Sequence, residues 1–415
     1  MSKLSNIKPT LSVLICAFIE CYDFMVYGNF SRIFSEMFFS HLTEEFAVVL
    51  SFMTFAIAFI VRPFGSLLFG YIGDKFGRKL ALFSSATLLI ISLSGITFLP
   101  QVEVIGVLSP ILLIIFRILQ GLSFAGEVGC MLLMMENVKD NRDIVFPMGA
   151  HFLISILGGA IGCFIFKLCY NFIPEAQFYS WGWRIPFFIG LIMSILLPFL
   201  RNSIEESRQY LEYNRQQKIS KVPILDVILH HKKSCCAIVF SVPFCNSLFY
   251  IFFVFLGIQQ KVSISLYALL ILMILISGAI FSMICRVYKP TTVALYSQIF
   301  FMIVISPIIY FLGFDSYITY LIIAISLGMC STPLFALFML VFPVNVRQTG
   351  FSVSYSIAAG CFGALTPVLF LWLSDSLQLI TAPIFCIDFY AVVSLYSFYY
   401  LKTHEKVIEY ESVYR

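Results

Sequence analysis

Residues 70–79 read Gly70-Tyr-Ile-Gly-Asp74-Lys75-Phe-Gly77-Arg78-Lys79 and lie between two apolar runs at 46–69 and 80–99. Each run is long enough to cross a bilayer as a helix, which takes about 20 mostly apolar residues. Glycine permits a tight turn between such helices, and lysine and arginine concentrate in cytoplasmic loops. Asp74 can cap a helix N-terminus or pair with a base. The stretch therefore predicts a cytoplasmic turn between two membrane helices.

The composition extends this interpretation to the whole chain. Of its 415 residues, 60% are hydrophobic and 12% charged, with a net charge of +4 and a mean hydropathy of +0.96. Soluble domains are about half apolar and a quarter charged. The composition indicates a polytopic membrane protein. It excludes a soluble enzyme, a disordered chain, a nucleic-acid binder and a secreted disulfide scaffold.

Apolar runs of about 18 residues or more recur along the chain, and each predicts a membrane-spanning helix, because an open sheet cannot face hydrocarbon. Twelve can be marked off, at 10–30, 46–69, 80–99, 108–134, 147–170, 184–201, 234–256, 263–285, 292–313, 317–342, 349–373 and 378–400. We expect an all-α polytopic membrane protein with twelve transmembrane helices.

The longest polar segment, Asn202–Lys233, divides these spans into six and six. The expected organisation is an N-terminal six-helix bundle at 1–202, a cytoplasmic central linker at 203–233, and a C-terminal six-helix bundle with a short cytoplasmic tail at 234–415. The linker mixes acids and bases and is interpreted as solvated, with a partly amphipathic helix. A partner-binding or lipid-sensing role is the alternative.

Orientation follows from the distribution of lysine and arginine. Placing both termini on one side puts twenty of these residues on that side and four on the other. The positive-inside rule then predicts cytoplasmic termini. The first apolar run carries Glu20 and Asp23 and has no small-residue cleavage site, so we expect a retained helix rather than a signal peptide.

Enzyme chemistry has no support in the sequence. The cysteines fall mainly in apolar stretches without metal-ligand spacing, which predicts buried thiols and no structural disulfide. The chain has no H-E-x-x-H motif and no Walker-type phosphate loop. We therefore expect no metal, no cofactor, no ATP drive and no catalytic residue. A sensor derived from a transporter is the alternative in this class, but the short tail and the intramembrane acids argue against it.

The 70–79 stretch matches, at every defining position, the loop signature G-x-x-x-D-(R/K)-x-G-(R/K)-(R/K). By this signature the chain resembles the major facilitator superfamily. The resemblance implies that Gly70, Asp74, Lys75, Gly77, Arg78 and Lys79 form a gating loop. It also implies two six-helix bundles, related by a pseudo-two-fold axis along the membrane normal, that rock about a central site.

Further motifs resemble the metabolite:proton symporter branch of that superfamily, which includes proline/glycine-betaine transporters and α-ketoglutarate, citrate and shikimate permeases. They run in family order, at Glu20–Gly28, Arg62–Gly65, Arg117–Glu127, Trp181–Phe187 and Phe342–Pro367. Cys21 stands where this branch usually has tryptophan, and the second-half counterpart of the glycine loop is reduced to Cys285–Pro290. The first departure weakens any copying of ligand specificity, and the second suggests an asymmetric cytoplasmic gate.

Ionisable residues inside the membrane are costly and are functional candidates by default. Glu20, Asp23 and Tyr27 share one face of the first predicted helix. One face of the fourth is shared by Arg117, Gln120 and Glu127. The resemblance implies that both helices line the cavity. Our hypothesis is that Asp23, with Glu20 or Glu127, is the proton-coupling group, and that Arg117 neutralises it or holds a substrate carboxylate. A purely structural ion pair is the alternative.

The numbers of acidic and basic residues within the spans indicate which charge the solute carries. Acids outnumber bases within the spans, so the cavity is poorly equipped for a di- or tricarboxylate. A zwitterion such as proline or glycine betaine needs one base and an aromatic or acidic surface, for which Tyr22, Phe24, Tyr27, Phe124 and Tyr355 are candidates. We therefore expect a monomeric proton symporter for a small zwitterionic solute in a bacterial inner membrane, with an organic acid as the alternative. Asp388, Asp375 and His151 are weaker candidates.

Overall fold

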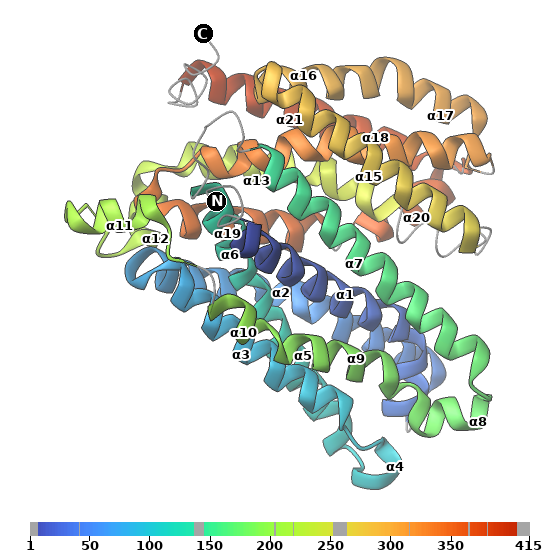
Figure 1. Ribbon diagram of the computed structural model, residues 1–415. Coiled ribbons are helices and arrows are strands. Elements are labelled where there is room, and N and C mark those ends of the chain that lie inside the picture. The colour runs from blue at the N-terminus through green and yellow to red at the C-terminus, as the bar shows by residue number, and fades with distance from the viewer. Residues whose placement is uncertain are drawn as a thin grey trace. The chain divides into compact units, whose positions relative to one another are not determined.

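The structure is a computed structural model that describes residues 7–40, 42–136, 145–202, 205–218, 220–251, 264–314, 316–363, 366–379 and 381–404. These residues form helices and short connections, and no strand occurs among them (Figure 1). The expected all-α membrane fold is confirmed.

Nine helical segments of the described part are long and apolar enough to cross a membrane. They correspond to the first six predicted spans and to those at 263–285, 292–313 and 317–342. Of the other three, the run at 378–400 contains a shorter apolar helix, Pro383–Tyr399. A total of twelve is consistent with this pattern and stays a prediction.

The chain divides into two compact units. The first contains residues 1–133 and 154–207, and the second contains residues 134–153 and 208–415. The division gives the end of the fourth predicted span and the start of the fifth to the second unit.

The first unit is built mainly from α1, α2, α3, α5, α7 and α9, with shorter helices between them. The bounds are α1 (Ile7–Phe38), α2 (Glu44–Phe76), α3 (Arg78–Thr97), α4 (Val102–Ile105), α5 (Leu108–Phe124), η1 (Ala125–Glu127), α6 (Val128–Glu136), α7 (Val145–Phe172), α8 (Glu175–Gln177), η3 (Phe178–Gly182), α9 (Arg184–Ile195) and α10 (Leu197–Asn202).

Two glycines bring α2 and α5 into close contact. A Cβ atom added to Gly65 would lie 2.5 Å from the carbonyl oxygen of Leu122. A Cβ atom added to Gly121 would lie 2.5 Å from the carbonyl oxygen of Ala58. Small residues at such crossings let membrane helices approach backbone to backbone. This approach places the buried polar face of α5 directly beside α2.

The second unit contains the last residues of α6, the first residues of α7, and all later elements. These are α11 (Arg208–Arg215), α12 (Pro223–His230), α13 (Lys232–Tyr250), α15 (Ile264–Val287), α16 (Pro290–Phe300), η5 (Phe301–Ile305), α17 (Ser306–Leu312), α18 (Tyr317–Leu340), η6 (Val344–Val346), α19 (Arg347–Ala358), η7 (Ala359–Gly363), α20 (Thr366–Leu377) and α21 (Pro383–His404).

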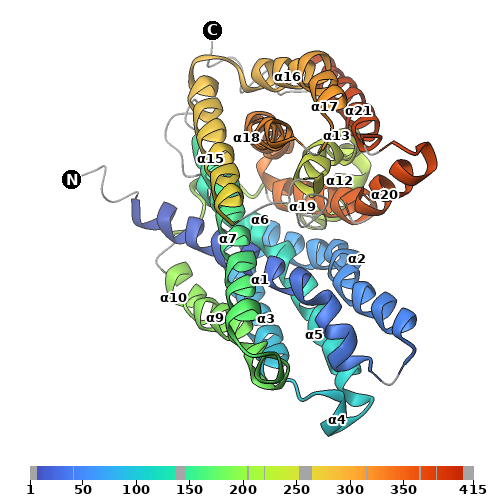
Figure 2. The same cartoon turned by 90° about the vertical axis from the view of Figure 1, so that its right-hand side faces the viewer.

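Within this unit, α18 packs against α13, α15 and α16 (Figure 2). The helix α19 is far less apolar than a lipid-facing helix, yet its Gln348, Thr349 and Ser352 are fully buried. Buried polar side chains inside a bundle lower the hydropathy of a segment without exposing it to water.

Candidate functional site

A chain of buried polar side chains links α1, α5 and α2 inside the first unit. The Gln120 amide donates through Nε2 to Oδ2 of Asp23, and its Oε1 accepts from Nη1 of Arg117. Asp23 is 1% exposed, and Gln120 and Arg117 are 0% exposed. The structure therefore places a neutral amide between the predicted acid and the predicted base.

Arg117 is contacted by several groups of the same unit. Its Nε donates to the carbonyl of Thr54, and its Nη2 donates to the carbonyl of Phe55, each at 3.2 Å. The guanidinium carbon lies 3.6 Å from the centroid of the Tyr27 ring. Carbonyl dipoles and the negative face of an aromatic ring both stabilise a cation out of water. Arg117 is thus a buried cation that is already solvated by protein groups.

Tyr27 connects this polar network to α2 through its hydroxyl. The hydroxyl oxygen lies 2.7 Å from Oγ1 of Thr54, and that Oγ1 also donates to the carbonyl of Ser51. One carboxylate oxygen of Asp23, Oδ1, is buried and has no hydrogen-bond partner among the residues that the structure describes. An unpartnered buried carboxylate oxygen is costly unless it takes up a proton or a ligand. The arrangement can therefore accept one proton, or one donor group, at Asp23.

Aromatic rings surround the polar chain. Phe24 packs against Phe55, Phe59 and Phe124, with ring centroids 4.9 to 5.5 Å apart. The Tyr22 hydroxyl donates to the carbonyl of Pro186, so this ring is fixed inside the unit. Of the aromatic residues proposed for a ligand cation, Tyr22 and Tyr27 therefore already have partners in the protein.

The two remaining acids of the predicted pathway lie close by. Glu20 is 3% exposed on α1, and Glu127 lies at the end of η1 with intermediate exposure. Both are near enough to the Cys21 thiol to interact with it electrostatically. Asp23, Tyr27, Arg117 and Gln120 thus form one contact network, and Glu20 and Glu127 lie beside Cys21 in the same unit.

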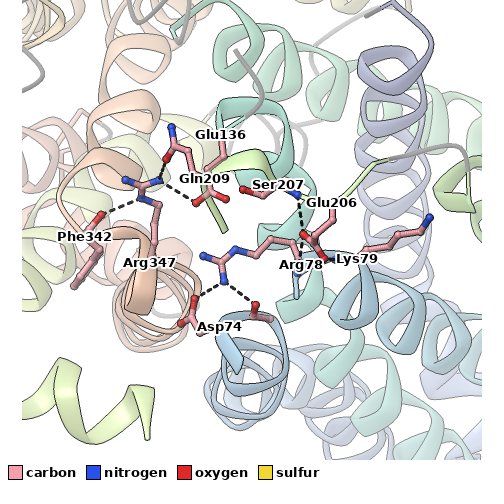
Figure 3. Close-up of polar contacts among 10 residues, drawn as sticks. Asp74, Arg78, Lys79, Glu136, Glu206, Ser207, Gln209, Phe342 and Arg347 are labelled. Carbon is pink, nitrogen blue, oxygen red and sulfur yellow. Dashed lines mark hydrogen bonds and ion pairs between the residues drawn. The ribbon is translucent and has the colours of Figure 1, made fainter. Parts of the chain in front are cut away.

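The glycine loop forms a second polar cluster in this unit (Figure 3). The Asp74 carboxylate pairs with Nη1 of Arg78 at 2.6 Å, and both side chains are fully buried. The same Nη1 donates to the carbonyl of Gly73 at 2.7 Å. Gly77, with φ 112° and ψ 150°, joins the end of α2 to the start of α3 in a conformation that favours glycine. Of the two roles expected for Asp74, it takes the pairing with a base.

The three bases of the loop have different surroundings. Arg78 is buried, whereas the Lys75 ammonium lies 4.8 Å from the Tyr71 ring centroid and Lys79 lies 5.9 Å from the Phe83 ring centroid. Only the two lysines are therefore in the position expected of surface anchors. Gly70 is buried within α2.

Glu206 caps α3, a role that the sequence did not reveal. Its two carboxylate oxygens accept from the backbone N–H groups of Arg78 and Lys79, each at 3.1 Å, and Oε1 also accepts from the N–H of Ser207 at 2.8 Å (Figure 3). A carboxylate at a helix N-terminus satisfies free N–H groups and the helix dipole. The start of the linker is thereby tied to the glycine loop.

Another cluster lies in the second unit, around Arg347 at the start of α19. Its Nη1 donates to Oε1 of Glu136 at 2.9 Å and to Oε1 of Gln209 at 3.0 Å, and its Nε donates to the carbonyl of Phe342 at 2.9 Å (Figure 3). Sequence reasoning placed Arg347 in a motif but did not find Glu136 or Gln209. The position of Glu136 as the acid that ends the fourth apolar run was the available signal.

The weaker candidates have simpler surroundings. Asp388 accepts a hydrogen bond from Ser306 at 2.5 Å, and His151 is 3% exposed within α7. The Asp375 side chain lies outside the described residues. The described cysteines are free thiols, and no group of three potential metal ligands occurs among the described residues.

Comparison with known proteins identifies the family. The sequence profile described as "Sugar (and other) transporter" matches residues 10–223, which include both polar clusters of the first unit. The chain belongs to the sugar (and other) transporter family of the major facilitator superfamily. The expectation that the protein is not an enzyme is thereby confirmed.

Curated relatives within this family have several named solutes. The chain is 29% identical over 398 residues to the inner membrane metabolite transport protein YhjE of Escherichia coli, covering 90% of this chain and 89% of that protein. It is 30% identical to the Escherichia coli shikimate transporter, over 54% of this chain and 52% of the relative. It is 34% identical to the Escherichia coli proline/betaine transporter, over 49% of this chain and 40% of the relative.

The fold is similar to that of solved transporter structures. The proton:xylose symporter XylE, bound to 6-bromo-6-deoxy-D-glucose, has a TM-score of 0.78 at 15% identity, with full coverage of both chains. The transporter FucP in an outward conformation has a TM-score of 0.64 at 13% identity, covering 95% of this chain and 99% of that chain. At these identities the likeness concerns the fold.

Proposed function

We propose that this member of the family is a secondary active transporter that takes up a small zwitterionic solute, of the proline or glycine betaine type, together with protons and by alternating access. The observation that carries the proposal is the buried chain from Asp23 through Gln120 to Arg117. The proton gradient is the expected drive, without a cofactor. The expected setting is a bacterial inner membrane, with both termini cytoplasmic and a monomeric protein.

The polar network from Asp23 through Gln120 to Arg117 offers a simple way to couple proton uptake to solute binding. With Asp23 ionised, Arg117 is balanced through Gln120 by one negative charge. When Asp23 takes up a proton, that balancing charge disappears and Arg117 becomes available to a solute carboxylate. Opposite charges in a low-dielectric site interact strongly, so the two events favour each other. Release of the proton on the other side reverses the preference and expels the carboxylate.

A zwitterion suits this site better than a dianion. Arg117 is the base in the network, and it is already contacted by two carbonyl groups and the Tyr27 ring. One carboxylate can be balanced there, whereas a second would have no matching base in this cluster. Phe24 and Phe124 are the aromatic residues of this network that we assign to the ammonium end, because Tyr22 and Tyr27 already bind protein groups.

Uptake of an organic acid is the second candidate, and the similarity to the shikimate transporter favours it. In that case Arg117, with Arg62 at the rim, would hold the carboxylate. The two candidates share the coupling acid and differ in whether a cationic group accompanies the carboxylate.

The test is uptake into proteoliposomes with an imposed inward proton gradient, comparing labelled glycine betaine or proline with α-ketoglutarate. Accumulation of the zwitterion, abolished by a protonophore, is the expected result. Accumulation of the keto acid instead would support the second candidate. Proton-driven uptake that survives both Asp23→Asn and Glu127→Gln would disprove the coupling proposal for either solute.

A further inference from the structure

The short helix α12 in the linker has two unlike faces. Pro223 and Val227 are buried where α12 packs on η6 and α19, and Val227 is 2% exposed. Leu225, Ile228 and Leu229 are 51%, 58% and 57% exposed. Their spacing of three and four residues puts these three side chains on one side of the helix. One side of α12 is therefore an exposed apolar face.

The position of α12 makes this face unusual. It lies outside the nine segments that are long and apolar enough to cross a membrane. It ends at His230, and α13 begins at Lys232, so α12 directly precedes the span predicted at 234–256 (Figure 2). An exposed apolar surface outside the spans marks an interaction site or a membrane contact. The closeness to a predicted membrane boundary favours the membrane.

Basic residues flank the apolar face. Residues 215–233 contain five lysines and arginines and a single acid, Asp226. Lys218, Lys221 and Lys232 are exposed, and the Asp226 carboxylate accepts a hydrogen bond from the Ser220 hydroxyl. Helices that lie in the interface of an anionic membrane typically combine an apolar face with exposed lysines.

We propose that α12 is an interfacial helix that inserts Leu225, Ile228 and Leu229 into the bilayer leaflet on the linker side, and that the flanking lysines bind anionic lipid headgroups. The face buried on η6 and α19 stays attached to the protein while the opposite face enters the lipid. Anionic lipid would then fix the position of the linker segment that leads into α13. This inference rests on the membrane topology and is independent of the transported solute.

The test places a tryptophan on the apolar face of the full-length protein in nanodiscs. Ile228→Trp is compared with Gln216→Trp, which labels an exposed polar position of the same linker. The parent protein supplies the background of the three native tryptophans. Brominated acyl chains quench a tryptophan only when it enters the hydrocarbon boundary. We expect the fluorescence added at position 228 to be blue-shifted and quenched, and that added at 216 to respond only to an aqueous quencher.

The lysines are tested in the same background. Brominated anionic lipid should quench Ile228→Trp more strongly than brominated zwitterionic lipid at the same mole fraction. Each exposed lysine near an anionic surface corresponds to a roughly fivefold preference. Replacing Lys218, Lys221 and Lys232 by glutamine should therefore remove the difference between the two lipids.

Two results would overturn the inference. A tryptophan at 228 that emits as in water and resists the brominated lipids would show that the face is solvated. A blue-shifted tryptophan that neither lipid quenches would show that protein, such as a second copy of the chain, covers the face. Leu229→Trp repeats the measurement on the same face if Ile228→Trp does not fold.

Discussion

The guanidinium carbon of Arg117 lies 3.6 Å from the centroid of the Tyr27 ring, so the buried base of α5 is stacked on an aromatic ring of α1. Both residues are fully buried. The ring and the Thr54 and Phe55 carbonyls replace water around the cation. Arg117 can therefore stay charged at a depth where a bare charge would be prohibitively costly.

Replacing the Tyr27 ring should destabilise this cation. Tyr27→Leu removes the cation–π contact, which contributes about 2 kcal/mol when desolvated, and should lower both the Tm and the rate of uptake. Tyr27→Phe keeps the ring and loses only the hydroxyl contact with Thr54, so its Tm should lie closer to that of the wild type. Thermal unfolding in detergent, with uptake measured in parallel, checks the order. Equal effects of the two changes would contradict a role for the ring.

The Gln120 amide, which joins Asp23 to Arg117, should be needed for stability and transport. Gln120→Leu leaves the Asp23 and Arg117 groups without their shared partner, and a buried polar group that loses its partner costs about 1–3 kcal/mol. We expect a lower Tm and loss of gradient-driven uptake. Gln298→Leu is a control, because Gln298 is also fully buried but lies in the second unit. If Gln120→Leu transported normally, Asp23 and Arg117 would not communicate through this residue.

The buried pair Asp74–Arg78 should respond more to single than to double substitution. Asp74→Asn or Arg78→Gln alone leaves a buried charge without its partner, which costs about 3–5 kcal/mol. The double variant removes both charges and should recover much of that loss. Lys79→Gln, in the same loop, should change the stability by less than about 0.5 kcal/mol. A double-mutant cycle on the Tm tests this, and strictly additive losses would contradict the pairing.

The carboxylate of Glu206 should stabilise the start of α3. Glu206→Ala removes the acceptor of two backbone N–H groups and should cost about 1 kcal/mol, as the loss of other N-caps does. Glu206→Gln keeps one acceptor oxygen and should cost less. Hydrogen exchange at Arg78 and Lys79 gives a local measure, with Glu212→Ala, on α11, as the control. Unchanged protection in Glu206→Ala would show that the cap contributes nothing.

Much of the first unit could be predicted from the sequence, because helical spacing decides which residues share a face. Asp23 with Tyr27, and Arg117 with Gln120, were assigned to common faces, and in the structure Asp23 contacts Gln120 while Tyr27 contacts Arg117. The loop signature likewise located the pair Asp74 and Arg78. These are local relationships, three or four residues apart.

The contacts that sequence reasoning missed join distant parts of the chain. Glu206 caps a helix that starts 128 residues earlier, and Glu136 and Arg347 are 211 residues apart. The linker acids also resemble ordinary solvated residues by composition. Helical periodicity gives the face of a residue but not which helix lies opposite. The insertion of Gln120 between Asp23 and Arg117 was missed for the same reason, since the opposite charges of Asp23 and Arg117 suggested a direct pair.

The central claim is that Asp23 carries the coupled proton, and the most direct test compares two modes of transport in proteoliposomes. Asp23→Asn should lose accumulation driven by a proton gradient but retain exchange of labelled for unlabelled solute, which needs no net proton movement. Asp388→Asn, a change of an acid in the second unit, should retain both. Accumulation by Asp23→Asn at the wild-type level, still abolished by a protonophore, would contradict the account.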